Sequence, residues 1–326
     1  MSEEIKNNLN EAPLVESNEV VEVSEEVVVE KKIHKHKYSG KEIFNIVWHH
    51  IYLLITAIVI LVPVLWMISA AFSSGSTLKE VKFLGEFSTK QFNYLFTQKS
   101  DPSAALPDFV NAFKNTLIIS ILNMIFVVFI STLNGFAVSR FRFKGKKALI
   151  LSMMMLQMFP SFMSMMAYFI IFQNFGWIGK FGGVFGLVLV YATGSVPINL
   201  FIVRGYLRSI PKSLDEAAYI DGASKVQLFF KIIFPLSFPI IGFVAVNAFM
   251  SPWLDYMLQG RILGSSGKWQ TVAVWLYKYN TVGQNPEYRP LLFMAGALVT
   301  AVPIVIVNFA MQKYIVYGMA TGAEKG

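Results

Sequence analysis

The clearest chemical pattern in the sequence lies in a charged stretch at 204–239, which separates two strongly apolar regions. Ser213 is followed three residues later by Glu216, the spacing of a capping box at the start of a helix. The carboxylate of Asp215 would lie in the first turn, where negative charge suits the helix dipole. The pattern therefore predicts a short, well-capped helix in this stretch.

The residues that follow predict where this helix ends and what it presents. Gly222 is the residue type that commonly ends a helix, and a second short helix can begin near Ser224. Ala217 and Ala218 leave one side without bulk, so another protein surface could approach closely. A connector lying on a membrane and a docking element for a partner are equally compatible with this pattern.

Residues for enzyme or metal chemistry are scarce. The chain has no cysteine, which excludes thiolate metal sites, and no G-x-x-x-x-G-K-[ST] phosphate loop. His49 and His50 stand alone, without acids or a nucleophile nearby in the sequence. We therefore expect no catalytic residues, no bound metal and no cofactor held by this chain.

Apolar residues make up 55% of the 326 residues and are concentrated in blocks. Each of six windows contains no Asp, Glu, Lys or Arg and has more than 20 residues, enough for a helix to cross a hydrocarbon core of about 30 Å. Prolines inside these windows predict kinked helices. We expect an all-α integral membrane protein with six transmembrane helices, at about 51–72, 115–137, 148–172, 183–203, 232–254 and 291–311.

The distribution of positive charge predicts the orientation of these helices. With the N-terminus in the cytoplasm, the inside segments hold 17 Lys and Arg residues and the outside loops hold 10. The shortest inside loop, Arg140 to Lys147, carries five basic and no acidic residues. Both termini are therefore expected to be cytoplasmic.

Three regions follow from this organisation. Residues 1–45 form a charged tail that is poor in aromatics and expected to be disordered. Residues 46–315 form the six-helix domain, with a cytoplasmic loop at 207–231, and residues 316–326 form a cytoplasmic C-terminal tail.

The end of the fifth window carries polar and aromatic side chains that suit a sugar, which presents hydroxyls and apolar ring faces. No carboxylate or lysine lies inside the six windows, although ion-coupled carriers commonly place one at the membrane midplane. The candidates for a substrate path, with core packing as an equal alternative, are Asn247, Ser251, Trp253, Asp255 and Tyr256.

The loop at 204–239 resembles the EAA motif of bacterial ABC importer permeases. Glu216, Ala217 and Ala218 are followed after three residues by Gly222, and then by Ile232 or Ile233 with Pro235. In that family the short helix is a coupling helix that sits in a cleft of a separate ATPase. The resemblance implies ATPase coupling by Ser213, Asp215, Glu216, Ala217, Ala218, Asp221 and Gly222.

The resemblance extends over nearly everything after residue 45. The segments 135–147 and 158–179 look like the carbohydrate branch of the family, and 313–326 looks like the end of the six-span maltose and maltodextrin permease subunits. In those subunits the tail reaches the ATPase dimer. This implies contact by Thr321, Gly322, Ala323, Glu324, Lys325 and Gly326, although Glu324 departs from the residue expected there.

Together these features are similar to a type I ABC importer permease in a bacterial cell membrane. The implied function is ATP-driven import of maltose, maltodextrin or a similar oligosaccharide. The implied partners are a second homologous permease subunit, an ATPase dimer that binds ATP and Mg²⁺, and an extracellular or periplasmic solute-binding protein. The sugar and the lipid bilayer complete the set, without nucleic acid.

Two other transport functions stay open, and a membrane enzyme is disfavoured. The EAA-like loop alone would also permit an ABC permease for a non-sugar solute such as a polyamine, a phosphonate or an amino acid. An ion-coupled secondary carrier would transport as the purified chain alone, without ATP.

Overall fold

The computed structural model describes residues 40–75, 77–83, 85–264, 267–280 and 289–323, with the side chains of residue 42 and of 313–323 excepted. Every regular element in this part of the chain is helical. The predicted tail at 1–45 lies mostly outside the described residues, and α1 begins within it, at Gly40. The elements are α1 (Gly40–Ala71), η1 (Leu78–Glu80), α2 (Lys90–Thr97), α3 (Asp108–Arg140), α4 (Lys146–Leu156), α5 (Ser161–Asn174), α6 (Phe181–Ser209), α7 (Ser213–Ile220), α8 (Lys225–Leu228), η2 (Phe229–Ile233), α9 (Phe234–Leu236), α10 (Phe238–Leu254), α11 (Met257–Leu263), α12 (Val272–Asn280) and α13 (Pro290–Ala323).

The chain divides into two units, Met1–Ala57 and Ile58–Gly326. The described part of the first unit is the beginning of α1, an apolar helix in which His49 and His50 each place Nδ1 within 2.7 Å of a carbonyl oxygen one turn earlier. All other elements belong to the second unit.

Among the described residues, four helices are long and apolar enough to cross a membrane. They are Ile43–Ala71, Asp108–Arg140, Phe181–Ser209 and Pro290–Gln312, and each contains one of the predicted windows or nearly all of it. The remaining two windows, at 148–172 and 232–254, are not single helices. The described part of the chain therefore has four candidate spans, or up to six if each bent pair is one span.

Proline explains both breaks. The pair Lys146–Leu156 and Ser161–Asn174 is bent by 93°, and Pro160 lies at the junction, where it disfavours helical backbone in the residue before it. The pair Lys225–Leu236 and Phe238–Leu254 is bent by 78°, and Pro239 follows the break with no N–H to bond back across it. The prediction of kinks was right in kind, but these bends are far larger than ordinary proline kinks.

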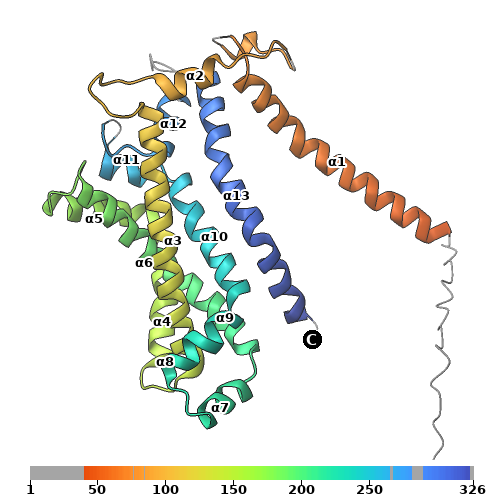
Figure 1. The fold of residues 1–326 in the computed structure, drawn as a ribbon, viewed down its shortest axis with the longest axis vertical. Helices are drawn as coiled ribbons and strands as arrows, with labels where there is room; N and C mark the ends of the chain where they lie inside the picture. Colours follow the sequence, from red (N-terminus) through yellow and green to blue (C-terminus); the bar gives the residue numbers. More distant parts are fainter. Residues whose placement is uncertain (1–39, 76, 84, 265–266, 281–288, 324–326) are drawn as a thin grey trace, which may run out of the picture. The chain divides into compact units, whose positions relative to one another are not determined.

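The core of the second unit is a bundle in which α3 packs on α6 and α10, and α10 also packs on α13 (Figure 1). At Gly135 of α3, an added Cβ would lie 2.5 Å from Cγ1 of Val203 on α6, so the absence of a side chain allows the close approach. Asn123 of α3 donates to the Ala248 carbonyl of α10 at 2.7 Å. The unit has α7 at one end and α2 and α12 at the other (Figure 1).

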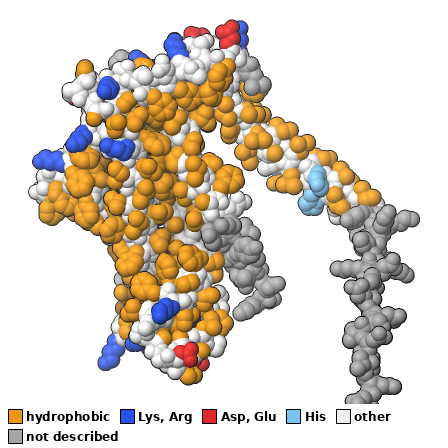
Figure 2. All heavy atoms as spheres, viewed as in Figure 1, with side chains coloured by type: hydrophobic (Ala, Val, Ile, Leu, Met, Phe, Trp, Pro, Cys, Tyr) orange, Lys and Arg blue, Asp and Glu red, His pale blue; other side chains and the backbone are white. Residues whose placement is uncertain are grey.

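Hydrophobic side chains cover most of the surface between these two ends on the face in view, as Figure 2 shows. Large hydrophobic side chains of the second unit that are exposed include Phe129, Phe159 and Ile198. Such a surface suits lipid or an apolar partner instead of water.

Candidate functional site

The short helix α7 lies where the sequence predicts it, but its cap differs. Helix α7 begins at Ser213 itself, and no side chain caps its N-terminus. The predicted capping box of Ser213 with Glu216 is therefore wrong, because Ser213 is already helical and Glu216 N–H bonds to the Lys212 carbonyl. The box belongs to the next helix, where Ser224 and Gln227 bond reciprocally at 2.8 and 3.3 Å.

The end of α7 is closed by a Schellman motif at the predicted helix break. Gly222 has φ of +79°, a backbone conformation that favours glycine. Its N–H bonds to the Tyr219 carbonyl at 3.1 Å, and the N–H of Ala223 bonds to the Ala218 carbonyl at 2.9 Å. The hydrogen bonds of this turn thus connect the end of α7 to α8 through Gly222.

An ion pair holds the inner face of α7 to the end of α3. Asp215 is buried, and its Oδ2 lies 3.0 Å from Nε of Arg140, the last residue of α3. Nη2 of Arg140 also donates to the Ile210 carbonyl at 3.1 Å. Beside the pair, Ala218 packs in a cluster that includes Val203 and Phe229.

The ion pair with Arg140 does not fully offset the cost of burying the charge of Asp215. Burial raises the pKa of Asp215 above the usual aspartate range, and the positive charge of Arg140 opposes that shift. The second carboxylate oxygen, Oδ1, is buried without a hydrogen-bond donor. The positive charge of Arg140 is therefore the main compensation for the buried negative charge of Asp215.

The outer face of α7 is exposed and largely apolar. Leu214 and Tyr219 are exposed, and Ile220 is 86% exposed. Of the seven residues assigned to coupling, Asp215 and Ala218 are buried against the bundle, while Ser213, Glu216, Ala217, Asp221 and Gly222 are exposed. The sequence did not single out Arg140 as the partner of Asp215. Arg140 is one of the five basic residues at 140–147, and this concentration of positive charge was a signal for an anionic partner.

The five residues assigned to a substrate path do not converge. Asn247 is exposed and its amide bonds to the Phe243 carbonyl of its own helix at 2.9 Å. Ser251 accepts a hydrogen bond from Asn123 at 3.2 Å. Trp253 is buried, with its ring edge-on to that of Phe113 at 5.3 Å, so core packing accounts for it.

Asp255 and Tyr256 lie just beyond α10 and have structural partners. Asp255 accepts from the Tyr191 hydroxyl at 2.6 Å and from the Leu258 N–H at 3.0 Å. Gln259 of α11 donates to the same hydroxyl at 3.0 Å, which ties α11 to α6. Tyr256 stacks on Tyr277 at 4.3 Å between ring centroids. The sequence did not predict the roles of Tyr191 and Gln259, because they are far apart along the chain.

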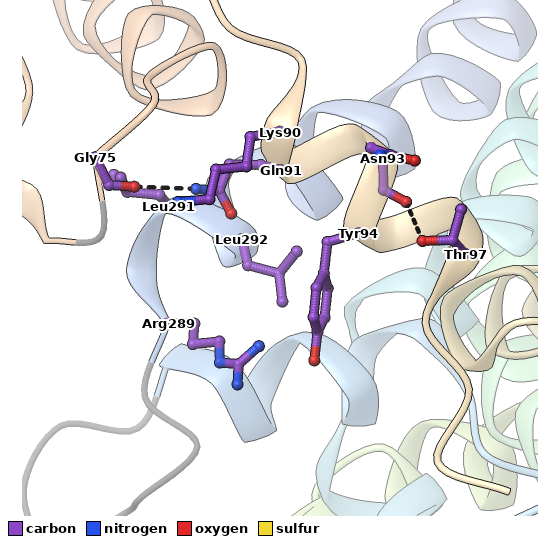
Figure 3. Close-up of a pocket in the computed structure, with 9 residues that line it drawn as sticks. All are labelled: Gly75, Lys90, Gln91, Asn93, Tyr94, Thr97, Arg289, Leu291 and Leu292. Atoms are coloured by element: carbon purple, nitrogen blue, oxygen red, sulfur yellow. Dashed lines mark hydrogen bonds between the residues drawn. The ribbon is translucent and has the colours of Figure 1, made fainter.

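A pocket of about 600 Å³ opens at the other end of the second unit, between α2 and the start of α13 (Figure 3). The Arg289 guanidinium lies 4.9 Å from the ring centroid of Tyr94, and Gln91 donates to the Gly75 carbonyl at 3.2 Å. Burial raises the pKa of nearby Tyr279 to about 12, so its phenol stays neutral. None of the predicted path residues lines this pocket.

The C-terminal contact residues cannot be placed by their side chains. Residues 321–323 end α13, and residues 324–326 lie outside the described part of the chain. Within the described residues, no three His, Cys, Asp or Glu side chains come together as metal ligands.

Long apolar helices and two sharply bent helix pairs in the described part of the chain are typical of a polytopic membrane protein. Residues 131–319 match the family described as "Binding-protein-dependent transport system inner membrane component", and the chain belongs to this family. It is therefore a non-catalytic component of a membrane transport system, as predicted.

Several relatives support this assignment. The galactooligosaccharides transport system permease protein GanQ of Bacillus subtilis (strain 168) is 33% identical over 86% of this chain and 96% of that protein. The maltodextrin transport system permease protein MdxG of the same organism is 32% identical over 88% of this chain and 99% of that protein. The predicted relationship to carbohydrate-type ABC permeases is confirmed.

A solved structure shares the fold. The crystal structure of a bacterial ABC transporter involved in the import of the acidic polysaccharide alginate contains a chain with a TM-score of 0.69 and 20% identity, which covers 85% of this chain and 98% of that one. The all-α ABC importer permease fold is thus confirmed. The count of six spans and the orientation of the termini stay predictions.

Proposed function

We propose that this chain is one permease subunit of an ATP-driven importer for an oligosaccharide, of the maltose or maltodextrin type. Relatives named for galactooligosaccharide and maltodextrin transport match it over more than four fifths of its length, which supports a sugar. The partners are a second homologous permease subunit, an ATPase dimer that carries ATP and Mg²⁺, and a solute-binding protein.

The observation that carries the coupling role is the two-sided character of α7. Its inner face is fixed to the bundle by the pair of Asp215 with Arg140, while its outer face leaves Leu214, Tyr219 and Ile220 exposed. Exposed apolar side chains on a short, rigidly held helix are typical of a surface that docks into a partner. The ATPase is the partner that the transport class requires.

Force applied to α7 has a continuous route into the bundle. The ion pair with Arg140 transmits it to the end of α3. Helix α3 contacts α6 closely at Gly135 and is bonded to α10 through Asn123. Movement of α7 when the ATPase closes would therefore displace α3, α6 and α10 together and alternate access to the sugar route.

The same proposal fixes the orientation. The α7 end is cytoplasmic, as the excess of Lys and Arg in the segments on that side supports, and both termini are on that side. The membrane is the bacterial inner membrane. Contact of residues 321–326 with the ATPase is part of this proposal.

Co-expression of the full chain with a partner permease and its ATPase tests the docking surface. Changing Ile220→Asp places a charge on the most exposed apolar residue of α7. We expect ATPase recovery in a pull-down to fall at least about tenfold, since a disrupted interface anchor costs about 2 kcal/mol or more. The matched control is Phe83→Asp, an exposed apolar residue outside α7, which should leave recovery unchanged.

Uptake by the assembled complex in proteoliposomes identifies the substrate class. Labelled maltooligosaccharide should accumulate only with ATP inside and binding protein outside. Accumulation of a polyamine or an amino acid instead would support the non-sugar alternative. Transport by the purified chain alone without ATP would overturn the proposal in favour of an ion-coupled carrier.

A further inference from the structure

A strongly basic pocket at the α7 end is not used by the proposed coupling. It has a volume of about 260 Å³ and lies where α3 ends and α4 begins. The cationic residues that line it are Arg140, Arg142, Lys146, Arg208 and Lys212. They come from two stretches of the chain, 140–146 and 208–212, so folding brings them together. Figure 2 shows Lys and Arg side chains at this end of the unit.

Most of this positive charge has no protein counter-charge. Arg140 is paired with Asp215, whose carboxylate is also affected by neighbouring Glu216. Among the described residues, this is the only ion pair at the pocket, and no hydrogen bond involves the side chain of Arg142 or Arg208. The charge of Lys212 also acts on Asp215, without forming an ion pair with it. Arg142, Lys146 and Arg208 form no ion pair among the described residues.

The remaining cations lie close enough to repel one another. The charges of Arg204, Arg208, Lys212 and Arg142 all act on Lys146. Long basic side chains usually separate into water when nothing holds them together. A pocket that gathers them at a membrane boundary is instead suited to a multivalent anion such as a phosphate group.

We propose that this pocket binds the phosphate headgroup of an anionic phospholipid in the leaflet that faces α7. Helix α4 contains no buried residue, and Leu149 and Leu151 on it are exposed, so apolar surface for an acyl chain adjoins the cations. Basic pockets between membrane-spanning helices are a known type of headgroup site. A soluble phosphate would make no use of this apolar surface.

The proposal rests on the membrane placement of α3, α4 and α6, but not on ATPase coupling. A bound lipid would neutralise the pocket and join the ends of these helices beside the Arg140–Asp215 pair. It would thereby stabilise the part of the bundle on which α7 rests.

Native mass spectrometry of the purified full-length chain tests the site. The probes are phosphatidylglycerol and, for comparison, phosphatidylcholine of the same acyl composition. We expect the wild type to retain phosphatidylglycerol, and Arg142→Gln with Arg208→Gln to weaken retention by roughly 30-fold, because each of the two cations removed is worth about a fivefold change. The control, Lys79→Gln with Lys82→Gln, removes two cations outside the pocket and should retain the lipid as the wild type does.

Competition with glycerol phosphate distinguishes a lipid from a soluble phosphate. We expect millimolar glycerol phosphate to leave lipid retention unchanged, and displacement by it would overturn the lipid assignment. Equal retention by the wild type and the double variant would overturn the site. If the double variant does not fold, Arg142→Gln alone should show a smaller loss than the double variant was expected to show, and no loss would refute the proposal. Lipid retention is measured without an ATPase, so its failure is independent of failure of the proposed coupling.

Discussion

Removing the positive partner of the buried ion pair should loosen α7 from the bundle. In Arg140→Gln, the carboxylate of Asp215 stays buried but loses the cation 3.0 Å away, and the Ile210 carbonyl loses a donor. The outer face of α7 is untouched by this change. The variant therefore tests the attachment of α7 to the bundle without changing the exposed side chains on the outer face of α7.

The magnitude follows from the burial of the pair. Two unit charges at this separation attract by about 5 kcal/mol at an effective dielectric constant of 20. Desolvation offsets part of this attraction, and loss of one partner of a fully buried pair costs about 3–5 kcal/mol. Because the Asp215 side chain is 12% exposed, we expect a cost of about 2–3 kcal/mol.

Substitution of Asp215, the other member of the ion pair, should lower stability less than Arg140→Gln does. Burial raises the pKa of Asp215, so the folded state favours the protonated carboxyl. The contribution of Asp215 to folding stability is fully present below the usual pKa of 3.8, and it is lost as pH rises through the folded-state pKa. At neutral pH the buried negative charge of Asp215 therefore destabilises the folded state, and the positive charge of Arg140 offsets part of this effect. Asp215→Asn removes this destabilising charge but leaves the guanidinium of Arg140, whose side chain is 5% exposed, without its anion. These two effects oppose each other, so we expect a cost of about 1 kcal/mol.

Hydrogen exchange of the α7 amides, followed by mass spectrometry on the purified chain, measures these effects. A loss of about 2–3 kcal/mol corresponds to roughly 30- to 150-fold faster exchange when α7 opens as a unit. The control is Lys144→Gln, an exposed neighbouring cation outside both the ion pair and the basic pocket. Unchanged α7 exchange in Arg140→Gln, or equal acceleration in Lys144→Gln, would refute the assigned role of the pair.

Three further predictions test the packing. Gly135→Ala should lower the thermal unfolding temperature and cost about 1–3 kcal/mol, since the new Cβ meets α6 at 2.5 Å, whereas Gly194→Ala has open space and should be neutral or stabilising. Gly222→Ala should cost about 1 kcal/mol and raise exchange at the end of α7, because φ is +79° there; equal exchange would contradict the Schellman closure. Tyr191→Phe removes the 2.6 Å hydrogen bond to Asp255 and should increase proteolysis or exchange in α11, with no increase meaning that α11 is held otherwise.

Local patterns in the sequence were sufficient for the helical class and for the ends of several elements. Charge-free windows of more than 20 residues predicted apolar helices, because composition and length alone decide whether a helix can cross a bilayer. The break after α7 falls at Gly222 as expected, since the left-handed conformation that closes this helix costs little only for glycine. The EAA-like spacing in the same loop pointed to the family.

The position of the capping box was decided by tertiary structure. Two Ser residues in the loop have a Glu or Gln three positions later, and the sequence does not distinguish them. The backbone makes Ser213 helical and leaves Ser224 extended, so only Ser224 can cap. Likewise, a window's composition does not reveal whether proline bends it slightly or by 93°.

Contacts between distant segments explain the side-chain partners that the sequence did not predict. Arg140 finds Asp215, and Tyr191 finds Asp255, only once α3, α6, α7 and α10 are packed together. Trp253 suited a sugar path by residue type, yet packing placed its ring against Phe113. Residue type and local spacing were sufficient to predict the helical membrane class of this chain and its family. The partner of each buried polar group depended instead on how the helices approach one another in three dimensions, which no local pattern encodes.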